Sequence, residues 1–189
     1  MILMRHAETV FNVVFGGMRI DPGICDPALT VAGRAQAAEA TEALRAAEVR
    51  RVVASPYARA LETAHIVARA LGLPVAVEPL VRERTAFACD IGTPRSHLAA
   101  RWAGVAFDRL EEIWWSDGEE PPDSFEARCR AFRRTMAGAP DWPHVLVVTH
   151  WGVIRSLTGR TVKNCETVRL DPTAPTADGR DGTGPGADG

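Results

Sequence analysis

The sequence predicts an α/β fold, a three-layer α/β/α sandwich with a mostly parallel sheet and a small lid insertion. Short apolar segments of strand length alternate with longer segments that have helical character, as in α/β proteins. One apolar segment, at residues 145–148, is continuous, which is typical of a strand buried on both faces. Polar residues stand directly after three of the apolar segments. The 189 residues, 46% hydrophobic and 24% charged, fit one globular domain.

The first half of the chain is expected to hold three strands and two helices. Thr30 can cap an Ala-rich helix, and Ser55 followed by Pro56 reads as an N-cap and N1 pair for a second helix. Gly72 would end that helix, because glycine readily adopts the left-handed conformation of a C-terminal cap. The predicted elements are a strand at 2–4, a helix from 30 to about 47, a strand at 52–54, a helix from 57 to 72 and a strand at 75–77.

The second half departs from this alternation before returning to it. Residues from about 87 to 122 are rich in aromatic side chains and end in a Pro-rich turn, so they are expected to form a lid inserted over the sheet. A helix at 124–136, a strand at 145–148, a helix from 153 and a strand at 166–170 follow. The predicted catalytic domain is therefore 1–170, and 171–189, acidic and rich in Gly and Pro, is expected to be disordered.

Composition excludes several classes of protein. The net charge is −2, and the final segment from 171 carries four aspartates against one arginine, which leaves residues 1–170 at +1. A nearly neutral domain is not a nucleic-acid surface. No apolar run approaches the roughly 18 residues that span a bilayer, so we expect a cytoplasmic protein without a membrane partner. The four cysteines are too widely spaced for a CxxC zinc site and are expected to be free thiols, most of them buried.

Polar residues that follow different strands should meet at one edge of the sheet. Arg5 and His6 follow the first strand, Arg59 lies just beyond the second, and His150 follows the strand at 145–148. The carboxyl ends of parallel strands share an edge, and ligands bind there. Guanidinium pairs neutralise and orient a phosphate dianion, and an imidazole can attack phosphorus. The sequence therefore predicts a phosphate site.

Four ordered motifs carry a resemblance to a known family. They are RHAET at 5–9 with Asn12 beyond it, DPALTVAGRAQA at 26–37, SPYARALETA at 55–64 and VTHWG at 148–152. Together they resemble the signature of the histidine phosphatase superfamily, in its phosphoglycerate-mutase-like branch, with Ala7 replacing the usual glycine. The resemblance covers residues 1 to about 170, and four motifs in order are far more specific than one.

The resemblance implies a role for each matching residue. His6 would be the nucleophile and would form a phosphohistidine that water then hydrolyses. Four groups would bind the phosphoryl oxygens alongside Arg5, namely Asn12, Arg59, His150 and the backbone N–H of Trp151. No metal and no cofactor are implied, because positive side chains take the place of the magnesium used by other phosphoryl-transfer enzymes.

The sequence motifs identify the general acid less clearly than they identify the other site residues. The family usually supplies a glutamate after the third strand, and Glu83 stands at that place, with Glu78 as the alternative. The mutases continue ERHYG, whereas this chain reads ERTAF. Glu8 could orient the site or react, and Ser55 reads as a helix cap. Four more residues are either surface charge or contacts to the non-reacting end of a substrate: Arg84, Arg95, His97 and Arg101.

The predicted activity is metal-independent phosphomonoester hydrolysis through a phosphohistidine on His6, acting on a small phosphorylated metabolite. One alternative is a phosphoglycerate-type mutase, which the missing ERHYG and the short chain argue against. Another is a catalytically inactive phosphate-binding module. The sequence leaves the oligomeric state and the physiological substrate open.

Overall fold

A five-stranded sheet forms the centre of the molecule. The computed structural model of the chain describes residues 1–175. The strands lie in the order β3-β2-β4-β1-β5, and all neighbouring pairs are parallel except β1 with β5, which is antiparallel. This arrangement confirms the predicted mostly parallel sheet. The strands are β1 (Ile2–Arg5), β2 (Arg51–Ala54), β3 (Val75–Val77), β4 (Val145–Thr149) and β5 (Thr167–Arg169).

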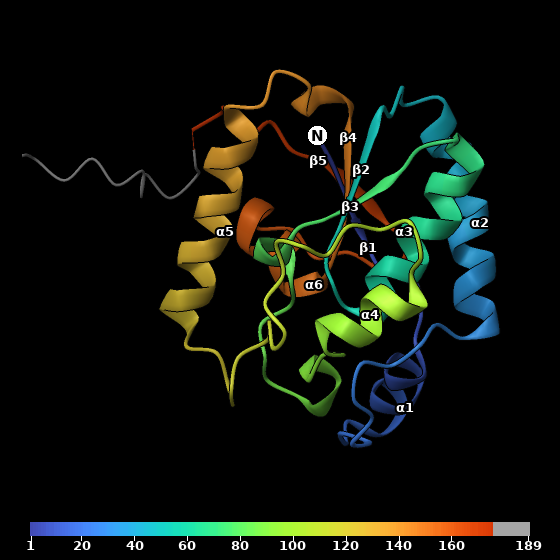
Figure 1. Cartoon of the computed structure of the whole chain (residues 1–189), viewed down its shortest axis with the longest axis vertical. Helices are drawn as coiled ribbons and strands as arrows, with labels where there is room; N and C mark the ends of the chain where they lie inside the picture. The colour runs from blue at the N-terminus through green and yellow to red at the C-terminus, as the bar shows by residue number, and fades with distance from the viewer. Residues whose placement is uncertain (176–189) are drawn as a thin grey trace, which may run out of the picture.

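Helices cover both faces of the sheet, as Figure 1 shows. On one side lie α2 and α3, and on the other lie α5 and α6, so the molecule has the three layers that the sequence predicted. The helices are α1 (Val10–Met18), α2 (Val31–Arg45), α3 (Ala58–Leu71), α4 (Arg95–Arg101), α5 (Pro122–Ala137) and α6 (Trp151–Thr158).

The strand side chains alternate between two hydrophobic cores. Met4 and Val148 pack in the core on the α3 side, whereas Leu3 and Val147 pack in the core under α5 and α6. All five residues of β4 are buried, because β4 lies between β1 and β2 and has a helix layer on each face. Burying such a side chain fully contributes about 1.5–3 kcal/mol. The continuous apolar run at 145–148 therefore marks the centre of the sheet.

The predicted helix caps are confirmed at two positions and corrected at a third. Thr30 is the N-cap of α2 and accepts from Gly33 N at 2.8 Å, and Gly72 ends α3 with φ +70°. Ser55 is not the cap of α3, because Tyr57 holds that position without a side-chain cap bond. The Ser55 hydroxyl lies 2.7 Å from His150 Nε2 instead. A fully buried imidazole needs a polar partner, and that need overrides the local capping preference.

Helix α1 was not predicted, since the sequence after β1 reads as an irregular stretch with several Gly and Pro residues. A capping box starts this helix, in which Thr9 Oγ1 accepts from Asn12 N at 3.2 Å and Asn12 Oδ1 accepts from Thr9 N at 3.1 Å. Val10 and Val13 of α1 are exposed. The helix therefore lacks the clear apolar stripe on which the sequence prediction relied.

The segment expected to be a lid is part of the main core. It contains a short 3-10 helix, η2 (Ala88–Asp90), and helix α4. Its side chains Leu98, Phe107 and Trp114 are buried in the same cluster as Tyr57 of the α3 side. The segment therefore closes one side of the α3 layer and shares its packing.

The chain after β5 turns back against α5. Arg133 donates to the backbone carbonyls of Asp171, Pro172 and Ala174, and Pro172 is buried. These first residues of the expected disordered segment 171–189 are thus held in place, and the prediction for 176–189 lies outside the described residues. Within residues 1–175, no helix combines the length and the apolar character needed to cross a bilayer.

Candidate active site

The main chain of the central strands places both histidines. His6 N donates to Thr149 O at 2.9 Å, at the carboxyl ends of the paired strands β1 and β4. His150 follows β4 directly and is the N-cap of α6. The two ring centroids lie 5.2 Å apart. Residues 144 positions apart in the sequence are therefore brought together by sheet register, as the strand pattern predicted.

His6 is arranged as a neutral imidazole with one nitrogen free. Its Nδ1 lies 2.8 Å from Ala7 O, and since a carbonyl only accepts, Nδ1 carries the proton. Burial, followed by the positive charges of Arg59 and Arg5, holds the pKa of His6 well below its usual range. The lone pair on Nε2 is thus available at neutral pH for attack on phosphorus.

His150 is fully buried and also neutral. Its pKa is held well below the usual range, chiefly by burial and then by the charge of Arg59. Nε2 pairs with the Ser55 hydroxyl, whereas the buried Nδ1 has no hydrogen-bond partner among the described residues. The Tyr57 ring meets the imidazole edge-on at 5.2 Å. One ring nitrogen is therefore held by the protein, and the other is buried without a partner in the described part of the chain.

Arg59 is 3% exposed, and protein acceptors already hold its guanidinium. Nη1 donates to Cys89 O at 2.6 Å and Nη2 donates to Asp90 Oδ1 at 3.0 Å, while the guanidinium carbon lies 4.2 Å from the Tyr57 ring centroid. The neighbouring Asp90 charge counts among the groups that raise the pKa of Arg59. A cation predicted to bind phosphate is thus paired with a buried carboxylate.

Asp90 is a site residue that the sequence analysis missed. Its Oδ1 pairs with Arg59, and its Oδ2 accepts from the backbone N–H groups of Ala86 and Phe87 at 3.2 Å each. The sequence offered only one acidic residue in a loop as a signal. Asp90 therefore both holds this loop in its conformation and brings a carboxyl group to the predicted phosphate site.

Arg5 is the second predicted guanidinium. Its Nη1 donates to Val162 O at 3.0 Å, and its Nε is buried without a partner in the described part of the chain. Burial lowers the pKa of Arg5, which the negative charge of Glu83 partly offsets. Arg5 thus has donor capacity left for an anion.

Glu83 is well placed to be the acid. Its Oε2 accepts from Gly152 N at 2.9 Å and its Oε1 accepts from Arg84 N at 3.0 Å. Burial raises the pKa of Glu83, so its carboxyl holds a proton more readily than usual. The alternative, Glu78, accepts from Leu80 N and caps the 3-10 helix η1 (Pro79–Val81). The geometry favours Glu83.

A glycine at position 152 makes this placement of Glu83 possible. A Cβ atom on Gly152 would lie 2.3 Å from Glu83 Oε1, which is far closer than real Cβ contacts. The Val81 carbonyl accepts from Thr149 Oγ1 at 2.7 Å and ties the chain before Glu83 to the end of β4. The Glu83 carboxyl is thus positioned by β4 and by the first turn of α6.

Asn12 and Trp151, the other two predicted phosphate ligands, both line the same cavity as His6. Asn12 Oδ1 accepts from Thr9 and from Asn164 Nδ2, which leaves the amide nitrogen of Asn12 to donate to a ligand. Asn164 Nδ2 also donates to His6 O at 2.9 Å, a contact that the sequence did not predict. Trp151 is the first residue of α6, and a helix N-terminus favours anions.

The motif at 26–37 is structural. Thr30 Oγ1 donates to Glu8 Oε1 at 2.7 Å, and Glu8 N donates to Gln36 Oε1 at 3.1 Å. A Cβ on Gly33 would lie 2.2 Å from Glu8 O, so only glycine allows α2 to approach this closely. Glu8 therefore orients the chain after His6, which is one of the two roles expected for it.

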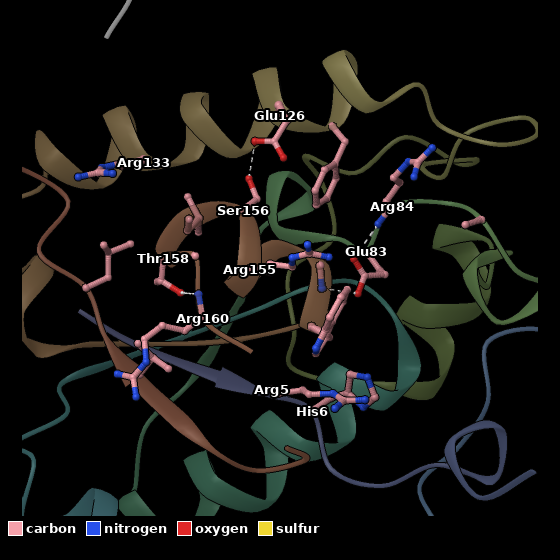
Figure 2. A pocket seen from close by; sticks show the side chains of 18 of the residues that line it. Arg5, His6, Glu83, Arg84, Glu126, Arg133, Arg155, Ser156, Thr158 and Arg160 are labelled. Atoms are coloured by element: carbon pink, nitrogen blue, oxygen red, sulfur yellow. Dashed lines mark hydrogen bonds between the residues drawn. The ribbon is translucent and has the colours of Figure 1, made fainter. Parts of the chain in front are cut away.

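One cavity of about 2410 Å³ is lined by six of the seven predicted residues: Arg5, His6, Asn12, Arg59, Glu83 and Trp151. The seventh, His150, is 0% exposed and does not line the cavity, although its ring centroid lies 5.2 Å from that of His6. Figure 2 shows Arg5 and His6 together, with Glu83 above them. Within residues 1–175 no group of three or more His, Cys, Asp or Glu side chains is placed to hold a metal ion.

Known proteins match this chain along most of its length. It is 29% identical over 172 residues to glucosyl-3-phosphoglycerate phosphatase of Mycobacterium tuberculosis, covering 86% of this chain and 75% of the relative. It is 35% identical over 155 residues to the probable phosphoglycerate mutase GpmB of Enterobacter sp., covering 78% and 67%.

The solved structures agree with these matches. The mycobacterial glucosyl-3-phosphoglycerate phosphatase complexed with VO3 has a TM-score of 0.63 at 25% identity and covers 88% of each chain. Ecdysone phosphate phosphatase from Bombix mori, in complex with tungstate, shares the fold with a TM-score of 0.67 at 18% identity and 93% coverage of each chain. Residues 1–175 match the family profile from the first strand to beyond the last, and the chain belongs to the histidine phosphatase superfamily (branch 1), as its four motifs predicted.

Proposed function

We propose that the protein is a metal-independent phosphomonoester hydrolase that forms a phosphohistidine on His6 Nε2. Its relatives named as phosphatases support this enzyme class. The observation that carries the mechanism is the His6 tautomer, since Nδ1 donates to Ala7 O and burial keeps the ring neutral. The Ala7 carbonyl also stabilises the positive charge that the ring gains on phosphorylation.

The reaction divides into two transfers of the same phosphoryl group. In the first, the Nε2 lone pair attacks phosphorus, the bond to the ester oxygen breaks, and protonated Glu83 gives its proton to that oxygen. In the second, the Glu83 carboxylate takes a proton from water as the water oxygen attacks phosphorus. The bond to His6 then breaks, and inorganic phosphate leaves a neutral His6 and a protonated Glu83.

Positive charge and oriented donors bind the phosphoryl oxygens. Arg5 and Arg59 supply two guanidinium groups, and the proposed further donors are the Asn12 amide, the Trp151 N–H and His150 Nδ1. These groups act on charge that develops during transfer, which is the task of magnesium in other phosphoryl-transfer enzymes.

The proposed substrate is a small phosphorylated metabolite. Two relatives are named for phosphorylated glycerate compounds, which makes such esters a sensible first panel. We also propose a cytoplasmic site of action, because a reducing compartment keeps thiols free and the four cysteines are free thiols in the structure. Cys89 and Cys129 are buried, Cys165 is half-buried and Cys25 is exposed.

The decisive variant is His6→Ala, with His97→Ala on the exposed surface of α4 as the matched control. We expect His6→Ala to lower the kcat for p-nitrophenyl phosphate at least 1,000-fold and His97→Ala to change it less than twofold. Wild-type enzyme should keep its activity in excess EDTA and should yield an acid-labile, base-stable phosphoenzyme after brief exposure to substrate. A fully active His6→Ala enzyme would overturn the mechanism.

Mutase activity is a second candidate, because a relative at 35% identity is named a probable phosphoglycerate mutase. The two activities differ only in whether water or a bound hydroxyl accepts the phosphoryl group from His6. Exchange between 2-phosphoglycerate and 3-phosphoglycerate, followed by NMR, measures mutase activity directly. We expect release of inorganic phosphate without exchange.

A further inference from the structure

The cavity extends past the catalytic residues as a groove between α5 on one side and α6 with β5 on the other. We call this part the outer groove and define it by its lining residues in 126–137, 155–160 and 168–175. In Figure 2 the labelled side chains run from Arg5, His6 and Glu83 through Arg155 to Arg160 and Arg133. The outer groove therefore opens from the proposed phosphoryl site.

Positive charge is concentrated in this cavity. Ten of the 20 arginines in residues 1–175 line it, but only five of the 21 acidic residues do. The whole chain has a net charge of −2. A general preference of the sequence for arginine over lysine would not by itself concentrate the arginines in this cavity. The distribution therefore points to a ligand with several negative charges.

Four of these arginines have no carboxylate partner in the described structure. Arg130, Arg134, Arg155 and Arg160 are exposed, and no ion pair to residues 1–175 involves them. The nearby acid Glu126 instead accepts from Ser156 Oγ at 2.7 Å. The guanidinium groups are thus available to a ligand.

The spacing of the lining residues along α5 and α6 gives the length of the outer groove. Arg155 follows Trp151 by one turn of α6, about 6 Å along the axis, and stacks over the Trp151 ring at 5.2 Å. On α5 the lining residues Glu126, Arg130 and Arg134 follow at intervals of four, so they share one face over about 12 Å. A transferring phosphoryl group occupies only the start of this path. The rest is available to the leaving group.

The arginines of the expected lid do not serve this purpose. Arg95 pairs with Glu112, and Arg101 stacks over Trp102 at 5.4 Å. Neither residue lines the cavity. Of the four residues that the sequence offered for the non-reacting end of a substrate, only Arg84 lines the cavity, where it pairs with Glu119. The cavity arginines without a carboxylate partner on α5 and α6 are therefore the candidates that remain for the outer groove.

We propose that the outer groove binds the leaving group of an elongated small-molecule phosphomonoester that carries further phosphate groups. The proposal rests on the proposed function for the identity of the reacting end. Each phosphate group brings about −1.5 to −2 charge at neutral pH, so two of them balance four guanidinium groups, whereas four carboxylates would be needed.

The test compares ligands of increasing length as inhibitors of p-nitrophenyl phosphate hydrolysis, with EDTA present. We expect tripolyphosphate to bind at least tenfold more tightly than orthophosphate. In the triple variant Arg130→Gln/Arg134→Gln/Arg160→Gln this preference should fall below threefold, while the Ki of orthophosphate and the kcat/KM of p-nitrophenyl phosphate stay within twofold of wild type. The matched control Arg50→Gln/Arg69→Gln/Arg109→Gln removes the same charge from other exposed positions and should behave as wild type.

Equal affinity for the two anions in wild type, or the same loss in both triple variants, would overturn the proposal. Inhibition by a hexaglutamate peptide as strong as that by tripolyphosphate would assign the groove to acidic peptides and would equally overturn it. Calorimetric titration of the His6→Ala protein with both phosphates measures binding without turnover. The groove can therefore be judged even if the protein proves not to be a hydrolase.

Discussion

The two walls of the candidate active site are built in different ways. The strand wall carries His6 and His150, which the register of β1 against β4 fixes through main-chain hydrogen bonds. The loop wall carries Glu83 and Asp90, which follow the three-residue edge strand β3 and stand in a segment of short 3-10 turns. Carboxylates on the loop wall therefore depend on bonds from other elements for their positions.

The walls also differ in charge. Both histidines of the strand wall are neutral, whereas the loop wall presents two carboxyl groups to the guanidinium groups of Arg5 and Arg59. Backbone geometry thus positions the proposed nucleophile, whereas side-chain electrostatics set the protonation of the proposed acid and the affinity for phosphate. Changes to the loop wall should alter proton transfer and phosphate affinity without displacing the nucleophile.

The largest effect is expected from Glu83→Gln, which removes the proposed acid and keeps its shape. Hydrolysis of alkyl phosphates should slow at least 100-fold, and that of p-nitrophenyl phosphate less than tenfold, because a phenolate leaves without protonation. Glu78→Gln is the matched control. Equal slowing of both substrate classes would place the acid elsewhere.

The pH profile of alkyl phosphate hydrolysis checks the same residue. The wild-type rate should fall as the pH rises through the raised pKa of Glu83, since the proton is then lost. The Glu83→Gln enzyme should lack this fall in rate.

Gly152→Ala tests the contact that positions the acid without changing the acid itself. The new Cβ would meet Glu83 Oε1 at 2.3 Å, so the carboxyl must move. We expect kcat for alkyl phosphates to drop 10- to 100-fold with little change for p-nitrophenyl phosphate. Gly138→Ala provides the control, because its Cβ would meet only backbone oxygens at 3.7 Å or more. Unchanged kinetics in Gly152→Ala would show that the placement of Glu83 by α6 is unimportant.

Asp90→Asn tests the anionic side of the loop wall. Removing this charge leaves Arg59 without its counter-charge, so the Ki values of orthophosphate and vanadate should decrease about fivefold. The free protein should lose stability, since an unpaired buried charge is costly, and phosphate should restore more of its Tm than in wild type. Asp141→Asn, which breaks the half-exposed pair with Arg51, should leave phosphate affinity unchanged. Weaker phosphate binding in Asp90→Asn would contradict the view that Asp90 and phosphate compete for the charge of Arg59.

The smallest effect is expected from Ser55→Ala on the strand wall. The variant leaves His150 Nε2 without its partner, which costs about 1–3 kcal/mol of stability. We expect a few-fold lower kcat with an unchanged KM, and recovery in Ser55→Thr, which keeps a hydroxyl. The matched control Ser156→Ala removes a half-buried hydroxyl that contacts Glu126. A change confined to the Tm would reduce Ser55 to a purely structural residue.

The strand wall could be predicted from sequence and the loop wall only in part. Arg5, His6 and His150 stand at the ends of apolar runs, so sheet topology alone brings them together. Asp90 could not be found this way, because its role depends on a loop conformation and on Arg59, which lies 31 positions earlier.

The other differences between the sequence predictions and the structure have local physical causes. Ser55 before Pro56 has the pattern of a helix cap, and only the folded structure reveals that its hydroxyl hydrogen-bonds with the buried imidazole of His150. The Thr9–Asn12 pair looks like part of a catalytic motif and also starts α1. Aromatic residues at 102–115 predict a core but cannot say that the core is shared with α3.

The hydrogen bond from Gly152 to Glu83 places the protonation of Glu83 and the binding of phosphate at the same helix end, so the two equilibria are coupled. The Glu83 carboxylate and a bound phosphate are both anions near the first turn of α6. Each therefore raises the free energy of the other while both are charged. Bound phosphate must therefore increase the affinity of Glu83 for a proton, and by reciprocity the protonated enzyme must bind phosphate more tightly. Product release is then coupled to proton release, and the enzyme should free its phosphate more easily in alkaline surroundings than in acidic ones.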